Sequence, residues 1–340
     1  MQINVTHPTG HVASATGLIS VAPMMDRTDS HCRYFMRLMG ADIRLYTEMV
    51  TAQAVLRGDR HWLLGFDGSE KPLALQLGGS DPDLLARAAV LAEQYHYDEI
   101  NLNIGCPSDR VQSGRFGACL MPVPNLVADC VRAMGEATTI PVTVKTRIGV
   151  DEHDDYDFLA SFVEVVAAAG CEIFIVHARK AVLAGLSPKE NREVPPLRYP
   201  TVYRLKRDFP ELGIILNGGI DSPGSVGEHL RHVDGVMIGR KAYADPFFLA
   251  GLQRRFLDAG QQHLCQVPAR AEIVRAMASY AERQLSQGVR LHHITRHMLG
   301  LYSGQPGARQ WRRYISENAR RRDAGPEVLL DSLSLFTLAA

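Results

Sequence analysis

The sequence predicts an α/β protein, a (β/α)8 TIM barrel followed by a small all-α helical domain. Eight short runs rich in Val, Ile and Leu recur in the first 240 residues, each followed by a polar turn and most by a segment of helical period. Such alternation is typical of a parallel sheet covered on both faces, and eight units in roughly 230 residues fit a closed barrel. An open doubly wound sheet is the alternative, but no G-x-G-x-x-G turn follows the first run.

The expected strands are the apolar runs, namely 17–23, 43–48, 73–79, 99–105, 141–147, 172–179, 213–219 and 234–240. Three of the intervening segments have clear apolar faces at helical spacing: 81–96, which begins with Asp81 as N-cap and Pro82 in the first turn, 125–137 and 157–170.

Beyond Phe248 the strand signals stop, and glycines and prolines divide the rest into helices of bundle length. The expected helical segments are 249–260, 269–288, 289–304, 308–321 and 326–340. We therefore expect an N-terminal tail over 1–16, a catalytic barrel domain over 17–250 and a helical domain over 251–340.

Composition indicates an ordinary globular protein, with 46% hydrophobic and 22% charged residues in 340. No run approaches the 18 apolar residues of a membrane span, and the N-terminus lacks the basic start and apolar core of a signal peptide. We expect a cytoplasmic protein without a membrane partner, and a monomer. The six cysteines lie far apart with no C-x-x-C pair, so we expect free thiols and no metal site.

Charge is unevenly distributed along the chain. Residues 1–249 hold 24 Lys and Arg against 30 Asp and Glu, whereas residues 250–340 hold 13 against 7, and all 13 are arginine. Because arginine pairs with phosphate and stacks on bases, a polyanionic partner is indicated for the C-terminal segment.

In a barrel of this class the chemistry lies at the carboxyl ends of the strands. The residues at those ends are Pro23, Met24, Met25, Glu48, Gln76, Asn103, Cys106, Lys145, Arg147, His177, Arg179, Asn217, Gly218, Gly219, Gly239 and Arg240. The glycines after the last two runs could let backbone N–H groups approach a phosphate, or could only make tight turns.

Gln76, Lys145 and His177 offer an amide, a positive charge and an imidazole, a set suited to the N1–O2 edge of a flavin. Alternatively, Lys145 is salt-bridged at the rim or acts as a Schiff-base nucleophile, and His177 is structural. Cys106, locked between Gly105 and Pro107, could be a buried thiol. Its place on a loop over the barrel mouth favours instead a proton donor acting on a substrate.

Several motifs together resemble the tRNA-dihydrouridine synthases, most closely their A-type branch. They are APMMDRTDSHCRYF, TEMV, LQLGG, NLNIGCPSDRVQSGRFGACLM, VKTRIG, VHARKAVLAGLSPKENREVPPL, NGGI, GR and LGLYSGQPGARQWRRY, and they span residues 17 to 325. The resemblance implies an FMN enzyme that uses NADPH to reduce the C5–C6 bond of a D-loop uridine, at position 20 or 20a, with Cys106 as proton donor. It assigns FMN contacts to Pro23, Met24, Met25, Gln76, Lys145, His177, Asn217, Gly218, Gly219, Gly239 and Arg240.

The resemblance also implies RNA contacts. Asn103 would bind the uracil edge, or could be a turn-forming asparagine; Lys189 and Arg192 would reach tRNA from loop 185–197, or that loop could be a solvated lid. Arg309 and Arg312, three apart on one helical face, match the family's tRNA-recognition positions, whereas Trp311 between them is expected in the core.

Three other functions stay open from the sequence. A flavin barrel could reduce a free pyrimidine or an enone, although it would not need an arginine-rich helical domain. A non-catalytic RNA-binding barrel and a Schiff-base aldolase acting through Lys145 are the others.

Overall fold

The computed structural model describes residues 19–258 and 268–337. The expected tail, residues 1–16, and Cys265 lie outside this part of the chain. The described residues form two compact units, which are taken in turn. The first comprises 19–23, 44–65 and 72–238, and the second comprises 24–43, 66–71, 239–258 and 268–337. The expected boundary at residue 250 stays a prediction.

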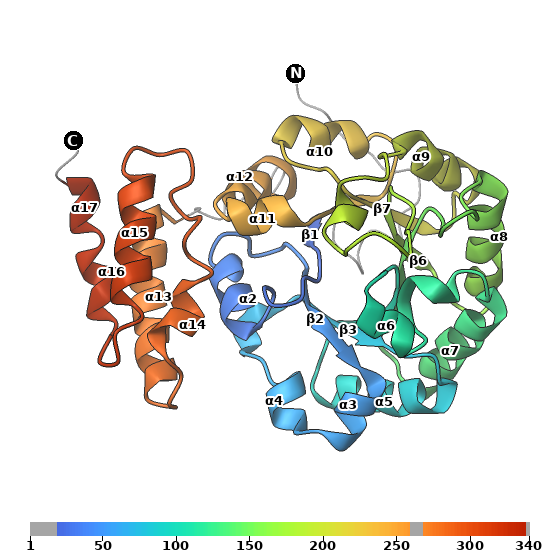
Figure 1. Cartoon of the computed structure of the whole chain (residues 1–340), viewed down its shortest axis with the longest axis horizontal. Helices are drawn as coiled ribbons and strands as arrows, with labels where there is room; N and C mark the ends of the chain where they lie inside the picture. The colour runs from blue at the N-terminus through green and yellow to red at the C-terminus, as the bar shows by residue number, and fades with distance from the viewer. Residues whose placement is uncertain (1–18, 259–267, 338–340) are drawn as a thin grey trace. The chain divides into compact units, whose positions relative to one another are not determined.

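The first unit is built on a sheet of eight parallel strands in the order β1-β8-β7-β6-β5-β4-β3-β2. The two ends of the sheet meet: Val21 donates a backbone hydrogen bond to Arg44 O at 2.9 Å, and Arg44 donates one to Ile19 O at 3.1 Å. The predicted barrel is therefore confirmed (Figure 1). The strands are β1 (Ile19–Val21), β2 (Leu45–Thr51), β3 (Leu73–Gly78), β4 (Glu99–Ile104), β5 (Val142–Arg147), β6 (Ile173–His177), β7 (Gly213–Asn217) and β8 (Gly235–Ile238).

Helices ring these strands, as Figure 1 shows. They are α3 (Ala52–Arg57), α4 (Arg60–Leu64), α5 (Pro82–Gln94), α7 (Pro124–Ala137), α8 (Tyr156–Ala167), α9 (Tyr199–Asp208) and α10 (Pro223–His229). The short helix α6 (Asp109–Ser113) and the 3₁₀ turn η2 (Gly117–Leu120) lie between β4 and α7, and the 3₁₀ turn η3 (Glu190–Arg192) lies between β6 and α9. The expected Asp81 cap is present, because its carboxylate accepts the Leu84 N–H at 3.0 Å.

Apolar side chains fill part of the barrel interior. They form one buried cluster: Ala22, Tyr46, Ala74, Ile173, Ile175, Ile215 and Met237. Most expected strands prove one or two residues too long at the carboxyl end, where the chain leaves the sheet to form loops. The polar side chains of those ends are thereby held by the strands, while the residues after them are free to adopt loop conformations.

The second unit is helical. It contains α2 (Ser30–Arg37), η1 (Gly68–Glu70), α11 (Arg240–Ala244), α12 (Phe248–Leu252), the π-helical η4 (Gln253–Leu257), α13 (Arg270–Leu285), α14 (Leu291–Thr295), α15 (Ala308–Asn318), α16 (Glu327–Asp331) and α17 (Ser334–Thr337). It thus includes α2 and η1, which the sequence alone places inside the barrel segment.

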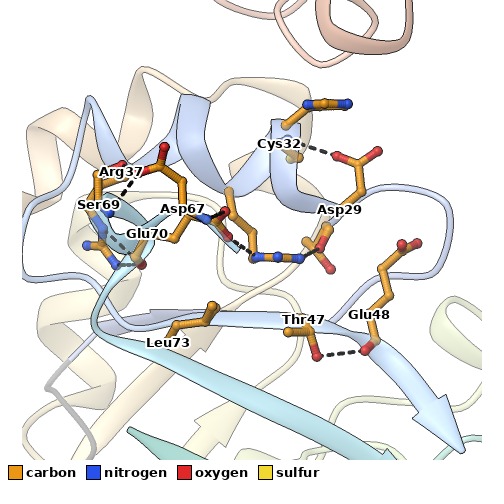
Figure 2. A network of polar contacts seen from close by, with 12 residues as sticks. Asp29, Cys32, Arg37, Thr47, Glu48, Asp67, Ser69, Glu70 and Leu73 are labelled. Atoms are coloured by element: carbon orange, nitrogen blue, oxygen red, sulfur yellow. Dashed lines mark hydrogen bonds and ion pairs between the residues drawn. The ribbon is translucent and has the colours of Figure 1, made fainter. Parts of the chain in front are cut away.

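A buried ion pair ties α2 to η1. Arg33 Nε lies 2.5 Å from Glu70 Oε2, and both side chains are buried. Glu70 also accepts the Asp67 backbone N–H, and Arg37 donates to the Glu70 carbonyl, as Figure 2 shows. Asp29 accepts the Cys32 N–H at 2.9 Å and caps α2. Since a buried charge is costly without a partner, residues 66–71 pack with this unit although they lie between two barrel strands in sequence.

The helix expected over 289–304 is wrong in extent. The structure has α14 only over Leu291–Thr295, followed by successive i→i+3 turns. Trp311 Nε1 donates a hydrogen bond to the Met298 carbonyl at 3.3 Å, and a Cβ at Gly300 would lie 2.5 Å from Ala244 O. Both contacts are tertiary, so the helical pattern of the sequence did not contain them.

Trp311 lies in the core of the second unit, as expected, with none of its surface exposed, whereas Trp62 on α4 is 80% exposed. Truncation of Trp311 to alanine should lower the free energy of unfolding by about 3–5 kcal/mol, because it leaves a large cavity. Trp62→Ala is the matched control and should change it by less than about 0.5 kcal/mol. Urea unfolding followed by circular dichroism measures both, and equal losses would contradict this account of the core.

Candidate functional site

The register of the parallel strands gathers polar side chains at one end of the barrel. Asn103 of β4 pairs with Lys145 of β5, and His177 of β6 pairs with both Arg147 of β5 and Asn217 of β7. These neighbours are separated by 30 to 42 residues in sequence. The structure therefore brings together most of the predicted site residues of the first unit.

Cys106 lies on the loop that leaves β4, and its backbone is held on both sides. The Asn103 side chain accepts the Gly105 and Cys106 N–H groups, each at 3.0 Å, and the Cys106 carbonyl accepts the Ala118 N–H at 3.0 Å. Gly117 has a φ of +76°, and a Cβ there would lie 2.6 Å from Cys106 O. A glycine at 117 thus permits the close approach that fixes the loop.

The Cys106 thiol is half-buried, with Sγ 3.4 Å from Ser108 Oγ. By contrast, Cys32, Cys130 and Cys171 are buried, and all five cysteines of the described residues are free thiols, as predicted. Cys106 therefore does not have the environment of a core-filling cysteine.

Arg147 clamps this loop to the loop that follows β6. Its Nε donates to the Gly105 carbonyl at 2.9 Å, and its Nη1 donates to the carbonyls of Lys180 and Asn191 at 3.0 and 2.9 Å. Gln112 makes a second tie, donating to Pro107 O and Leu183 O, both at 2.8 Å. The sequence does not predict Gln112 or Asn191, because nothing in their spacing indicates contacts to residues 71 and 44 positions away.

Three basic side chains share the site, and they differ in charge. Lys145 is half-buried, and its Nζ donates to Asn217 Oδ1 at 3.1 Å. Burial of the ammonium group, together with the Arg147 guanidinium, lowers the pKa of Lys145 to about 7. Burial and the same guanidinium hold the pKa of His177 well below its ordinary value, so the imidazole is neutral. Arg147 therefore carries the permanent charge, and Lys145 can gain or lose a proton near neutrality.

Cys106 interacts electrostatically with Lys145 and Arg147. Its sulfur raises the pKa of both side chains, whereas burial lowers it. A thiolate formed at Cys106 would thus be balanced by two cations nearby.

Gly218 and Gly219 follow β7 with φ of +114° and +71°. A Cβ at Gly218 would lie 2.6 Å from the His177 ring, and one at Gly219 would lie 2.5 Å from Tyr199 Oη. The two glycines are therefore required by packing and by backbone conformation, which is the turn alternative, and they also leave backbone without side-chain cover.

The amides of Gln76 and Asn103 bond to one another. Asn103 Nδ2 donates to Gln76 Oε1 at 2.9 Å, while Gln76 Nε2 donates to Asn101 Oδ1 at 2.7 Å. Asn103 thus forms the turn that the sequence left as its alternative role. One N–H of its amide lies beyond these bonds and is open to a further acceptor.

The other predicted residues fall in two groups. Pro23 ends the first segment of the barrel unit, and Lys189 and Arg192 are exposed on or beside η3. The second unit holds Met24, Met25, Gly239, Arg240, Arg309 and Arg312.

Within the second unit, Met25 is 51% exposed, and Gly239 precedes the exposed Arg240 at the start of α11. Arg309 and Arg312 are exposed on α15, whose Trp311 and Ile315 are buried. The helix is thus amphipathic, and its arginines face away from the core.

In the first unit, carbonyl groups of loop 185–197 accept hydrogen bonds from Arg179, which donates to Glu193 O at 3.2 Å and also to Pro195 O.

The described residues contain neither a membrane-spanning helix nor a cluster of metal ligands. Over 19–258 and 268–337, no helix is both long and apolar enough to cross a membrane. In the same part of the chain, no three His, Cys, Asp or Glu side chains are grouped so that they could hold a metal ion.

A closed barrel with reactive and basic side chains at the carboxyl ends of its strands defines an enzyme of the (β/α)8-barrel class. Residues 20–336 match the dihydrouridine synthase family. The chain belongs to this family.

Curated relatives match over nearly their whole length. The chain is 59% identical over 317 residues to the tRNA-dihydrouridine(20/20a) synthase of Salmonella typhimurium, covering 93% of this chain and 94% of the relative. It is 58% identical over 321 residues to the enzyme of that name from Escherichia coli K12, covering 94% and 92%. The Synechocystis enzyme of the same name is 56% identical over 320 residues, covering 94% and 95%.

Among solved structures, 2-naphthoyl-CoA reductase matches with a TM-score of 0.53 and 8% identity, covering 71% of this chain and 50% of that one. Histamine dehydrogenase from Rhizobium sp. 4-9 matches with a TM-score of 0.53 and 13% identity, covering 70% and 45%. At these identities the likeness concerns the fold.

The lowered pKa of Lys145 predicts a pH-dependent cost in stability. Below about pH 7 the lysine is protonated in both states, and the folded protein bears the full cost of the buried charge. Between pH 7 and the ordinary value of 10.5 the unfolded chain holds more protons, so this contribution to stability rises with pH. Lys145→Met should therefore stabilise the protein most below pH 7.

Urea unfolding of the protein freed of any bound cofactor, at pH 6 and pH 9.5, measures this difference. Lys189→Met, at an exposed lysine, is the control and should give a small, constant change. If Lys145→Met gave the same increment at both pH values, the buried-charge account would be contradicted.

Proposed function

We propose that the protein reduces the C5–C6 double bond of uridine in the tRNA D-loop, at position 20 or 20a, with FMN as cofactor and NADPH as electron source. Membership of the dihydrouridine synthase family and the names of the near-full-length relatives support the reaction. The observation that carries the proposal is the half-buried Cys106 thiol, held at the barrel mouth beside Lys145 and Arg147. We further propose that the protein acts as a monomer in the cytoplasm.

The residues of the barrel mouth fit an anionic, hydrogen-bonding cofactor. Lys145 has two N–H groups beyond its bond to Asn217, and burial together with the Arg147 guanidinium holds its pKa low. A negatively charged group there would raise that pKa and be stabilised in return. The neutral His177 and the amide of Gln76 add polar atoms of the kind a flavin edge needs.

We assign to FMN Gln76, Lys145, His177, Asn217, Gly218 and Gly219 of the first unit, together with Pro23. The assignment of Met24, Met25, Gly239 and Arg240 rests on the sequence resemblance. When bound, a reduced flavin supplies hydride to C6 of the uracil. Lys145, in its protonated form, would hold the cofactor's pyrimidine edge in place and offset its negative charge.

Cys106 is the proposed general acid. Hydride addition at C6 leaves negative charge spread over C5 and the C4 carbonyl oxygen, and the Cys106 S–H delivers its proton to C5. The resulting thiolate lies near the cations of Lys145 and Arg147, which stabilise it until solvent returns a proton. Since the thiol is half-buried, solvent can reach it.

Asn103 could position the base. Its side-chain oxygen is occupied by the two loop N–H groups, so it would contact uracil through its remaining amide N–H. That N–H can donate to a carbonyl oxygen of the base. Because its target lies in folded RNA, the enzyme would draw the uridine out of its stack.

The proposed RNA contacts outside the barrel mouth are Lys189, Arg192, Arg309 and Arg312, all exposed. Arg309 and Arg312 lie on the polar face of α15. Phosphate contacts by such residues position an RNA without reading its sequence.

One observation favours a second function. A lysine with a pKa of about 7 is suited to Schiff-base chemistry. Sodium borohydride would then trap a carbonyl substrate on Lys145, and the purified protein would be colourless. A yellow protein that absorbs at about 450 nm, as flavoproteins do, would favour the reductase.

Replacing Cys106 by alanine should abolish formation of dihydrouridine, by about a hundredfold or more, because the general acid is lost. Flavin content and NADPH oxidation should stay close to those of the parent protein. Cys119→Ala is the matched control, since Cys119, on η2, is another half-buried free thiol. Mass mapping of dihydrouridine in unmodified tRNA measures the product, and undiminished product from Cys106→Ala would refute the donor role.

Replacing Arg309 or Arg312 by alanine should weaken tRNA binding and flatten its dependence on salt. Each variant should lower the slope of log K against log salt by about 0.7 to 0.9, the share of one phosphate. Arg132→Ala is the control, because Arg132 is an exposed arginine of α7 in the barrel unit. Filter binding between 50 and 200 mM salt, the range over which such slopes are about linear, checks this, and an unchanged slope would exclude a backbone contact.

A further inference from the structure

The barrel interior contains a buried carboxyl group that the proposed mechanism does not use. Glu99, at the start of β4, is fully buried. Its Oε1 accepts the hydroxyl hydrogens of Tyr46 and Thr143, both at 2.7 Å, and its Oε2 lies 3.6 Å from Arg44 Nη1. Glu99 therefore presents an acceptor to the interior of the barrel, with a cation on its other side.

A chain of hydrogen bonds rises from Glu99 along three strands. Thr143 of β5 accepts the Asn101 Nδ2–H at 2.8 Å. Asn101 of β4 accepts the Gln76 Nε2–H at 2.7 Å, and Gln76 of β3 accepts the Asn103 Nδ2–H at 2.9 Å. Every member is buried, so water does not satisfy these groups and each depends on its neighbours.

The chain ends on the backbone that precedes the thiol. Asn103 Oδ1 accepts the N–H groups of Gly105 and Cys106, each at 3.0 Å. A sequence of five side chains thus connects the floor of the barrel to the loop that carries Cys106.

The direction of the chain is determined at both of its ends. Two backbone N–H groups demand an oxygen at the outer end of Asn103, which turns its amide nitrogen toward Gln76. The same reasoning orients Gln76 and then Asn101, because a reversed amide would set N–H against N–H. At the inner end the Thr143 hydroxyl must donate away from Asn101, and Glu99 Oε1 at 2.7 Å receives it.

The only other acceptor that the described residues offer the Thr143 hydroxyl is the Ile100 carbonyl, at 3.5 Å. This distance is too long for a good O–H···O bond. Glu99 and Thr143 thus supply the last acceptors of the chain. Without the Thr143 oxygen the Asn101 amide would lose its acceptor, and without Glu99 the Thr143 hydroxyl would lose its own.

We infer that Thr143 and Glu99 are positioning residues, which hold the Cys106 loop through the one-way chain Thr143, Asn101, Gln76 and Asn103. Neither residue touches the loop itself. The inference concerns the rigidity of the loop, and its consequence for the rate of uridine reduction rests on the proposed function.

The test compares three conservative variants on one strand. Thr143→Val removes the hydroxyl while keeping the shape of the side chain, and Thr143→Ser restores the hydroxyl. Thr146→Val is the matched control, because Thr146 is also buried on β5 and, among the described residues, its hydroxyl bonds only to the Arg147 carbonyl, at 3.3 Å. All three are made in the full chain.

Hydrogen–deuterium exchange and thiol alkylation report on the loop without requiring activity. In Thr143→Val, exchange of the amides of peptides covering 103–107 and alkylation of Cys106 by iodoacetamide should each be roughly tenfold faster, the change expected for loss of one buried hydrogen bond. Thr143→Ser and Thr146→Val should match the parent. If Thr146→Val loosened the loop as much, or Thr143→Val left it unchanged, the inference would be overturned.

Activity gives a second readout. Thr143→Val should lower kcat for dihydrouridine formation several-fold with the KM for tRNA unchanged, and Thr143→Ser should rescue it. A change in exchange without any product from the parent protein would contradict the proposed function while leaving the loop inference intact. If Thr143→Val does not fold, hydrogen–deuterium exchange of the parent protein tests the inference. Gly105 and Cys106 amides that exchange as fast as those of an unprotected loop would refute the chain.

Discussion

The parallel pairing of the eight strands is the constraint from which the rest of the barrel unit follows. Parallel strands all point one way, so every carboxyl end emerges at the same rim, and residues in register become neighbours regardless of their separation in sequence. The pairs Asn103 with Lys145 and His177 with Asn217 are direct results of that register. A slip of one residue in any strand would turn these side chains to its opposite face.

The barrel interior is divided between apolar packing and polar order. Ile173, Ile175 and Ile215 belong to its apolar cluster, whereas Glu99 and the amides above it form a chain of hydrogen bonds. A fully apolar interior would be less costly, since each buried polar group must find a partner. The polar side of the interior instead leads to the loop carrying Cys106, which connects the packing of the core to the placement of a reactive group.

The basic side chains of the mouth show how burial sorts chemically similar groups. Arg147 donates hydrogen bonds to three loop carbonyls, and His177 is neutral. Lys145, with a pKa of about 7, is left as the group whose charge responds to what binds beside it. The same electrostatics that would stabilise a bound anion lowers the stability of the protein without one.

The sequence by itself determined the eight strands, the exposed arginines of α15 and the candidate ring of polar residues, because alternation and periodicity are local properties of the chain. It did not determine that α14 ends at Thr295, that Arg147 donates to the Gly105 carbonyl, or that the Asn103 side chain accepts the Gly105 N–H. Those outcomes depend on carbonyls and amides brought close by folding from distant strands. Hydrogen-bond partners of that kind have no signature in the order of residues, and only the tertiary structure decides them.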